Sequence, residues 1–372
     1  MTILIGIIFL GVLVFLHELG HFLAAKLSGV AVEAFSIGMG PVLLHKEWRG
    51  TDWRLSLLPF GGYCAMKGEA DFEEHYNGNA QIDGDSFYGV KAVFRAFIGF
   101  AGPFANFLFS VFAFFVIALT GYTYYAVGNT IRLATEEHPE LHSAAADAGI
   151  ASGDKITKIN GKETADFSDI QLECFTHPDE DIFVTVNRNG EILTFPVHTD
   201  RDEETGYGRI GVMPDPDCIE EREVSPLGFF LAIREGVTQT FRLIQLSCRG
   251  IATLFKGAKV SSNMRGVLGS SHMLGETAKS GFSAGFKSGI VSVLQFMALI
   301  SVSLFIMNLL PIPILDGFLV LTSIVEAIFG FKVSPKARNI VQYVGIALIA
   351  LLFTLAMSGD FHYFMGLLNV KK

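Results

Sequence analysis

The chain has 372 residues, of which half are hydrophobic and only 17% are charged. With a mean hydropathy of +0.43, this is the composition of a membrane protein rather than a soluble one. The net charge of −9 lies mostly in the middle of the chain and in residues 69–85, and it argues against binding to nucleic acid. The four cysteines are scattered without a C-x-x-C pair, so they indicate neither a zinc site nor a disulfide framework.

The first apolar segment, residues 3–27, carries the motif His17-Glu18-Leu19-Gly20-His21. On a helix, residues four apart lie on one face, so His17 and His21 can both direct imidazole nitrogens at one ion. H-E-x-x-H is a zinc signature in which two histidines bind the metal and the glutamate acts as general base. As a helix the segment is roughly 37 Å long, enough to cross a hydrocarbon core, and His17 lies past its midpoint. The sequence therefore predicts a metal site inside a membrane.

Two other interpretations of this segment fit its residues less well. Histidines in an apolar helix are often packed core residues, but an ionisable group at bilayer depth costs roughly 2.5–3.5 kcal/mol or more and usually has a function. A signal peptide would have a basic N-terminal region and a small-residue cleavage site, and the segment has neither. We therefore expect a functional zinc site here.

Four segments are long and apolar enough to span a membrane: residues 3–27, 93–121, 289–310 and 338–358. Lysines and arginines cluster between the first and second segments and again between the third and fourth. By the positive-inside rule, residues 28–92 and 330–337 are cytoplasmic, whereas both termini and residues 122–288 are outside. His17 then lies in the cytoplasmic half of the bilayer.

Residues 33–68 predict a small β-sheet that dips into the membrane beside the metal site. Residues 35–41 and 53–63 have the pattern of short strands, and Gly61-Gly62 is a turn signal. Irregular backbone at membrane depth is tolerated only where it lines a protein cavity. The edge of this sheet, including Gly61 and Gly62, can pair with an extended substrate segment. A cytoplasmic cap without a substrate role explains these residues equally well.

The second span opens with Gly102-Pro103-Phe104-Ala105-Asn106. Small residues allow close contact between helices, and an asparagine can form hydrogen bonds across them. Asn106 therefore has two possible roles, in helix packing or in substrate binding.

The middle of the chain predicts a soluble domain followed by an amphipathic helix. Residues 144–161 combine a small-residue helix, a Gly-Asp turn and an alternating strand ending in Asn-Gly, and residues 182–198 form a hairpin around Asn189-Gly190. This pattern resembles a PDZ domain. In residues 227–256, four cations recur every seven or eight positions, which is typical of a helix lying in the membrane interface or packed on the soluble domain.

The third span ends in Asn308-Leu-Leu-Pro311-Ile-Pro313-Ile-Leu-Asp316-Gly317. Two prolines two residues apart cannot continue a helix, yet the chain stays apolar on both sides of them. Catalytic zinc takes three protein ligands and an open fourth position, and H-E-x-x-H supplies two. We select Asp316 as the third ligand. Its rivals are Glu326 and Asp360, neither of which follows a helix break, whereas His272 falls in the external segment.

The predicted fold class is a multi-pass α-helical membrane protein of about four spans, with a membrane-dipping β-loop and an inserted PDZ (α+β) domain. Residues 1–121 form the first part of the membrane core, with the first span, the β-loop and the second span. Residues 122–220 form the external PDZ-like domain, and residues 221–288 form amphipathic interfacial helices. Residues 289–372 form the second part of the core, with the third and fourth spans.

The motifs H-E-L-G-H, G-P-x-x-N and N-x-L-P-I-P-x-L-D-G, with a PDZ insert, resemble the site-two intramembrane zinc metalloproteases over nearly the whole chain. The likeness is closest to the RseP-type bacterial branch. It implies one zinc ion per chain held by His17, His21 and Asp316, with Glu18 as catalytic base and Asn308 in contact with substrate. The chain departs from some relatives in having one PDZ-like unit, and in Met264-Arg-Gly-Val-Leu-Gly269 where a Gly-Gly-Pro-like step is usual.

The resemblance implies a zinc-dependent endopeptidase of regulated intramembrane proteolysis. Its substrates would be single-span membrane proteins, such as an anti-sigma factor or remnant signal peptides, trimmed first by another protease. It would lie in the bacterial inner membrane, with the PDZ domain on the periplasmic side and the active site toward the cytoplasm. The alternative is a membrane PDZ scaffold with a structural zinc site, which would have no use for Glu18 as a base. A transporter would have inverted repeats and more spans.

Overall fold

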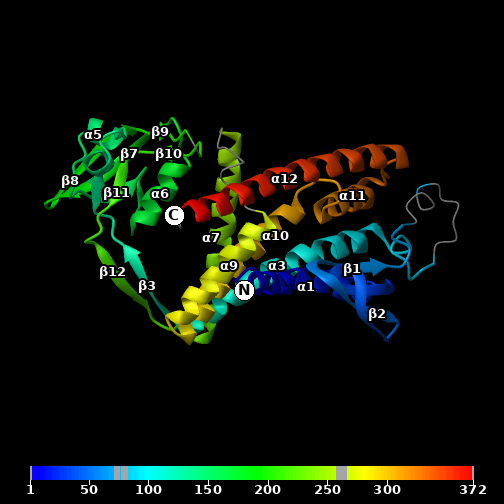
Figure 1. The fold of residues 1–372 in the computed structure, drawn as a ribbon. Coiled ribbons are helices and arrows are strands. Elements are labelled where there is room, and N and C mark those ends of the chain that lie inside the picture. Colours follow the sequence, from blue (N-terminus) through cyan, green and yellow to red (C-terminus); the bar gives the residue numbers. More distant parts are fainter. Residues whose placement is uncertain (1, 71–75, 77–82, 204, 257–265, 371–372) are drawn as a thin grey trace. The chain divides into compact units, whose positions relative to one another are not determined.

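The computed structural model describes residues 2–70, 76, 83–203, 205–256 and 266–370. The chain forms two compact units: the first comprises Met1–Thr120, Leu227–Ile244 and Arg265–Lys372, and the second Gly121–Pro226 and Gln245–Met264. Among the described residues, four helical segments are long and apolar enough to span a membrane, all in the first unit. They are α1 (Thr2–Leu27), α3 (Ala92–Thr120), α10 (Phe286–Leu309) and Asn339–Phe361 within α12 (Pro335–Val370) (Figure 1).

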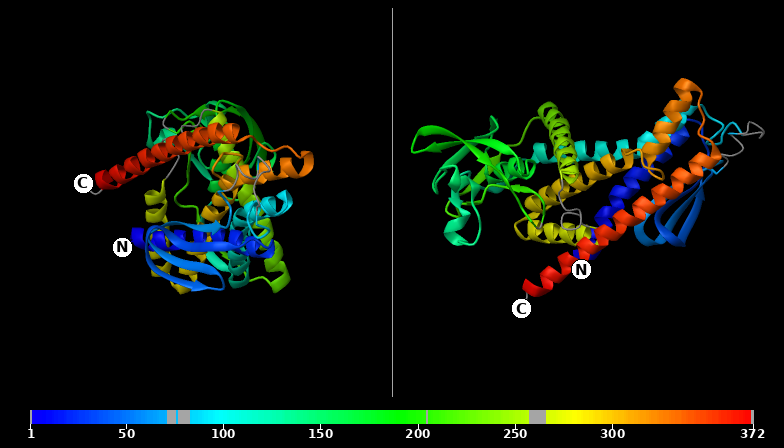
Figure 2. Two further views of the ribbon diagram at one scale, coloured as in Figure 1. Left: turned by 90° about the vertical axis from the view of Figure 1, so that its right-hand side faces the viewer. Right: turned by 90° about the horizontal axis from the view of Figure 1, so that it is seen from above.

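The helices of the first unit pack closely because glycines line their contacts. α1 and α3 lie side by side (Figures 1 and 2), and a Cβ on Gly20 of α1 would overlap the Ala101 carbonyl of α3. α9 (Val267–Ser283) approaches α1 in the same way, since a Cβ on Gly6 would overlap the backbone of Ser271. Leu13 of α1 is fully buried in a cluster with residues of α9 and α10.

β1 (Val32–Trp48) and β2 (Thr51–Met66) form the sheet that follows α1. Arg49 and Gly50 join them, both with positive φ (50° and 72°), as a two-residue hairpin turn requires. Residues 34–37 of β1 pair with residues 52–55 on one flank and with residues 62–65 on the other. In the described part of the chain, residues 62–65 have strand partners on one flank only and therefore form an edge of the sheet.

The predicted turn at Gly61-Gly62 is wrong, because both residues lie inside β2. The strands are also longer than residues 35–41 and 53–63, and the hairpin turn is at Arg49-Gly50. Gly61 has a φ of 82°, which bends the strand between its two paired stretches instead of ending it. A double glycine thus marks a bend in a strand as readily as a turn between strands.

The polypeptide breaks between α10 and α11 (Asp316–Phe329). Pro311 and Pro313 lie in this break, and Ile314 has a φ of 86°, which is rare for a β-branched residue. A Cβ on Gly317 would overlap the carbonyls of Leu309 and Leu310, so only glycine lets the start of α11 fold back against the end of α10. This tight turn places Asp316 in the first turn of α11.

The second unit is an α+β body. Its core is formed by buried aliphatic residues of the sheet and by Ile170 of α6 (Phe167–Phe175). The main sheet has the order β6-β5-β7-β8 and is antiparallel throughout: β6 (Lys162–Glu163), β5 (Lys155–Ile159), β7 (Asp181–Arg188) and β8 (Glu191–His198). The short helices are α4 (Ala134–Glu137) and α5 (Ala144–Asp147).

Three further strand pairings complete this unit or lead to its ends. β3 (Tyr122–Val127) pairs with β12 (Ile219–Val224), and these two strands begin and end the segment that the second unit takes from residues 121–226. The remaining pairs are β4 (Ile131–Leu133) with β11 (Val212–Pro214), and β9 (Asp200–Arg201) with β10 (Gly208–Arg209).

α7 (Phe229–Phe255) contributes residues to both units. In its first half, Ala232, Gly236 and Thr240 follow one another at four-residue intervals, and the Thr240 hydroxyl lies 3.2 Å from the Ser110 hydroxyl of α3. In its second half, Arg249 pairs with Glu173 of the second unit at 3.5 Å. The second half of α7 therefore packs on the second unit, a possibility that the sequence left open. A position in the membrane interface stays a prediction, as do the four domain boundaries.

Candidate metal centre

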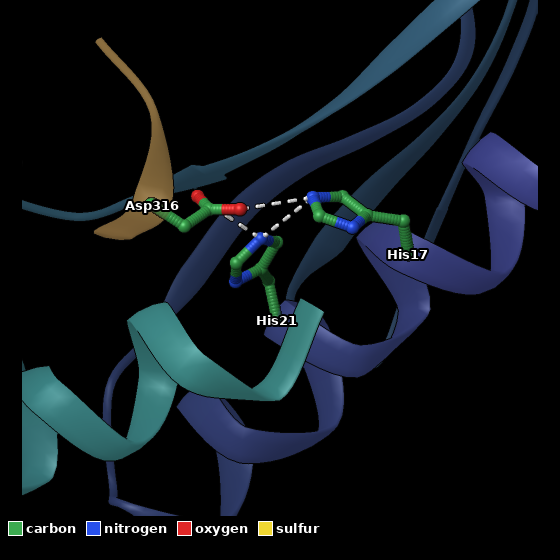
Figure 3. A group of neighbouring side chains, drawn as sticks. All are labelled: His17, His21 and Asp316. Carbon is green, nitrogen blue, oxygen red and sulfur yellow. Dashed lines mark hydrogen bonds and ion pairs between the residues drawn. The ribbon is translucent and has the colours of Figure 1, made fainter. Parts of the chain in front are cut away.

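Three side chains from α1 and α11 converge on one point. His17 Nε2 lies 3.2 Å from His21 Nε2, and the Asp316 carboxylate lies 3.1 Å from the first nitrogen and 3.4 Å from the second (Figure 3). All three ligand atoms lie within 4.8 Å of one another. The two imidazoles are buried and Asp316 is partly buried, so the group is shielded from bulk solvent. The structure thus brings together the three predicted zinc ligands.

The helical spacing of α1 explains the histidine pair. His17 and His21 are buried together with Leu13 and Ala24, at intervals of three or four residues along one face of the helix. This face packs on the rest of the first unit, whereas Leu23 and Leu27 are exposed. The histidines therefore point into the protein interior and away from the surface that would face lipid.

His21 is held by α3. Its Nδ1 lies 2.8 Å from the Ile98 carbonyl, so Nδ1 donates a proton to that oxygen and Nε2 keeps its lone pair for a metal. Gly102 makes room for the ring, because a Cβ at this position would overlap the imidazole. The glycine of the G-P-x-x-N motif is thus required by the position of the His21 ring.

His17 is held by Asn106, whose side-chain amide lies 3.2 Å from Nδ1. Asn106 is fully buried, and its Oδ1 has no hydrogen-bond partner among the described residues. With the amide turned so that Oδ1 faces the imidazole, Oδ1 accepts a proton from Nδ1 and gains a partner. The His17 Nε2 lone pair is then free for the metal. This position favours a role in orienting His17 over the predicted contact with substrate.

Glu18 lies beside the two imidazoles, between α1 and the sheet. Its carboxylate lies close to the Cys64 backbone, and its Cγ lies 3.2 Å from the place of a Cβ on Gly62. Glu18 is partly exposed, unlike the two histidines. A partly accessible carboxylate beside a candidate metal site is suited to proton transfer.

The two rival third ligands are bound elsewhere. Glu326 lies 2.5 Å from Arg95, and Asp360 accepts a hydrogen bond from the Gly266 backbone at 2.7 Å. His272 lies on α9 and is not part of the cluster. Among these acidic candidates, only Asp316 reaches the histidine pair.

The remaining predicted substrate contacts lie on two different elements. Asn308 is in the last turn of α10, partly buried, directly before the chain break. Gly61 lines an apolar groove of about 350 Å³ together with Phe15 and Ile37, and Gly62 lies next to Glu18. The segment Met264–Gly269 replaces the Gly-Gly-Pro-like step that is usual in relatives. Met264 and Arg265 lie outside the described residues, and Val267 to Gly269 begin α9.

The donor set fits zinc. Two neutral imidazole nitrogens and one carboxylate are a common protein ligand set for catalytic zinc, which keeps a fourth position open. Both imidazoles have a second contact that holds the ring in place, as metal-binding histidines usually do. Two neutral imidazole lone pairs and a carboxylate repel one another at these distances. A cation or a proton shared between them removes this repulsion.

Sequence reasoning missed the backbone group that holds His21. The Ile98 carbonyl belongs to a residue whose side chain carries no relevant chemistry. Ile98 and Gly102 lie one helical turn apart on α3, and this spacing is the one sequence feature that could have indicated the contact. By itself, however, it predicts close helix packing rather than a role at a metal.

Comparisons with known proteins identify the family. The model of peptidase family M50 matches residues 5–352. Three relatives are each named "Putative zinc metalloprotease". The one from Treponema pallidum is 31% identical, over 97% of this chain and 99% of its own length. Those from Campylobacter jejuni and Rhizobium meliloti are 31% and 30% identical, over 95% and 96% of this chain and 91% and 95% of their own lengths. The chain therefore belongs to peptidase family M50, the site-2 protease family, and is a membrane zinc metalloprotease.

Proposed function

We propose that this zinc metalloprotease cleaves transmembrane segments of single-span membrane proteins within the bilayer. His17, His21 and Asp316 would hold one zinc ion per chain, and Glu18 would act as catalytic base. The observation that carries the proposal is the convergence of these ligands from α1 and α11, beside Glu18, in the unit that contains the four potential spans. We therefore assign the family's intramembrane proteolysis to these four residues.

In the proposed mechanism, the residues divide the work between positioning and proton transfer. When bound, zinc would supply Lewis acidity, which polarises a scissile carbonyl and makes water a nucleophile at neutral pH. Glu18 takes the proton from the attacking water and passes it to the leaving amine. Ile98 and Asn106 keep the two imidazoles oriented during this exchange.

The sheet provides a place for an unwound substrate. A transmembrane helix hides its carbonyls in internal hydrogen bonds, so its backbone must open before hydrolysis, and open backbone in lipid needs new partners. Residues 62–65 form an edge of the sheet, and Gly62 and Cys64 adjoin Glu18. Strand addition at this edge would bring a substrate carbonyl beside the base. Gly61, Gly62 and Asn308 are the proposed substrate contacts.

The second unit is proposed to be a PDZ domain on the periplasmic side of the bacterial inner membrane, with the metal centre toward the cytoplasm. Its antiparallel sheet with two flanking helices supports this assignment. A largely apolar cavity of about 560 Å³ lies between α6 and residues 208–213 and is large enough for a peptide side chain or two. The domain would admit substrates already trimmed by another protease, such as an anti-sigma factor or remnant signal peptides.

The test is Glu18→Gln in the full-length chain, with zinc content and cleavage of a co-expressed single-span protein measured together. Glu276→Gln, on α9 of the same unit, is the matched control. We expect Glu18→Gln to keep its zinc and to lose cleavage, and the control to retain both. Undiminished cleavage by Glu18→Gln would contradict the catalytic role and favour a PDZ scaffold with a structural zinc site.

A further inference from the structure

Arg95, in the first turn of α3, is almost completely buried in the first unit. Its side chain is 2% exposed, and its Nη2 donates to Glu326 Oε2 at 2.5 Å. The other terminal guanidinium nitrogen donates to the Val90 carbonyl at 3.0 Å, and the group lies 5.2 Å from the centre of the Tyr88 ring. A buried charge is costly unless it is paired and hydrogen-bonded, and this one has both kinds of contact. The first unit therefore surrounds this charge with specific partners.

The ion pair joins α3 and α11, the two helices that hold His21 and Asp316 in place. On α3, Arg95, Gly99 and Gly102 are spaced four and three residues apart and share one face. Gly99 accommodates the side chains of Leu319 and Val320 of α11, and Gly102 accommodates the ring of His21. The face of α3 that holds Arg95 therefore contacts α11 and a metal ligand in succession.

On α11, the same contact runs from the metal ligand to the ion pair. Asp316, Leu319, Ser323 and Glu326 follow one another at three- or four-residue intervals, so they lie on one side of the helix. Ser323 in the middle of this side is buried. Asp316 and Glu326 are ten residues apart, roughly 15 Å along the axis, so the ion pair fixes the end of α11 opposite to the metal centre.

The Arg95–Glu326 ion pair matters because the chain is broken just before α11. Asp316 follows a non-helical segment, and α11 has only 14 residues and packs chiefly on α3 within the described chain. A tilt of α11 about its first turn would move the carboxylate relative to His17 and His21. Metal–ligand distances lie within about 0.2 Å of their standard values, so the direction of α11 matters for zinc.

We propose that Arg95 and Glu326 form a brace that sets the position of Asp316 relative to the two histidines. They are positioning residues and touch neither metal nor substrate. The brace rests on the proposed zinc site, and it goes beyond that site in assigning a role to a buried ion pair at the far end of α11. Its loss lowers zinc affinity and turnover without changing the affinity for substrate.

The test measures zinc affinity and the visible absorption of the Co²⁺-substituted protein, using full-length chain in detergent. For Glu326→Gln we expect zinc to bind about 10-fold more weakly and the Co²⁺ spectrum to change, as for changes next to metal ligands. We expect kcat to fall and KM to stay within about twofold. Glu326→Asp, which keeps the charge on a shorter side chain, should be intermediate. Asp85→Asn removes the carboxylate of an exposed pair with Lys67 and is the matched control.

Each outcome supports or overturns the brace. Zinc affinity and a Co²⁺ spectrum unchanged in Glu326→Gln would overturn it, and so would an equal loss of zinc in Asp85→Asn, which would indicate general destabilisation. If Glu326→Gln cannot be recovered folded, Arg95→Lys takes its place, because lysine keeps the charge but cannot make all three arginine contacts. His17→Ala separates the two proposals: undiminished zinc binding there would refute the metal site itself rather than the brace.

Discussion

The two units of the molecule treat ionisable side chains differently. In the membrane unit, Arg95, His17 and His21 are less than 10% exposed, and each contacts a part of the metal centre or the helices that carry it. In the second unit, His142 is 56% exposed and Arg201 about one-third exposed, and both pair with carboxylates that water also reaches. The comparison teaches that the neighbours of a charge matter as well as its burial, since Asp154 of the second unit is also buried but pairs with Arg188 of the same unit. Changes in the first unit should act on chemistry, and changes in the second on stability.

The largest effect is expected for Gly102→Ala in the membrane unit. A Cβ at this position would overlap the His21 ring, so the ring must turn away from the Ile98 carbonyl and from His17. Misplacing a reacting group by about 1 Å can cost about 100-fold in rate, and we expect at least that loss of cleavage. The measurement is cleavage of a single-span substrate with zinc content determined in parallel.

Gly228→Ala is the matched control for this change. Gly228 has no atom of the described chain within 4 Å of the place of a Cβ and no positive φ, so alanine fits there without strain. Its cleavage rate should stay within about twofold of that of the wild type. Gly102→Ala with activity that close to wild type would show that the α3–His21 contact does not position the ligand, and the contrast between the units would weaken.

The sequence was sufficient to predict which three side chains come together at the candidate centre, but not the groups that hold them in place. The i, i+4 spacing of His17 and His21 and the proline break before Asp316 are local patterns, and the structure brings these residues together. The Ile98 carbonyl is a backbone group that every residue has, so no local pattern marks it. The Arg95–Glu326 pair joins residues 231 apart, and its partners are chosen by helix packing.

The same limit applies to the fold. The four predicted spans coincide with four helical segments, because a long apolar run has few alternatives in a chain of this composition. The sheet after α1 was predicted with its turn at Gly61-Gly62, whereas the turn is at Arg49-Gly50. Both dipeptides can adopt positive φ, and only the pairing of residues 34–37 on two flanks decides between them.

A smaller effect is expected for Asp154→Asn in the second unit. The Asp154 side chain is 2% exposed and accepts two hydrogen bonds from Arg188 (2.7 and 2.8 Å) and one from the Ala151 backbone. Burial raises the pKa of the Asp154 carboxyl, but these hydrogen bonds and the charge of Arg188 together lower it by more, so the pKa lies below its ordinary value. Losing a hydrogen-bonded charge costs about 1.5–3 kcal/mol of stability. Thermal unfolding of the second unit should shift accordingly, with cleavage unaffected at a temperature where the unit is folded.

The pH dependence of this pair has a definite sign. A carboxyl whose pKa is lower in the folded than in the unfolded state stabilises the fold above its unfolded pKa, about 3.9, and the contribution is lost as the pH falls below it. The stability difference between wild type and Asp154→Asn should therefore be constant between about pH 6 and 8 and shrink toward about pH 3. A difference that grew in acid would contradict the assigned role of Arg188.

The smallest effect is expected for His142, and its sign is opposite. Its ring nitrogens lie 2.7 Å from Asp200 and 2.8 Å from Asp147, and hydrogen bonds to these two carboxylates raise the pKa of His142. The stabilisation is complete below the unfolded pKa of about 6.5 and is lost as the pH rises through the higher folded value. Because the side chain is 56% exposed, solvent screens the pair, and His142→Gln should change thermal stability slightly at about pH 6 and not at about pH 9. A large change at both values would contradict the assignment of His142 to an exposed pair that solvent screens.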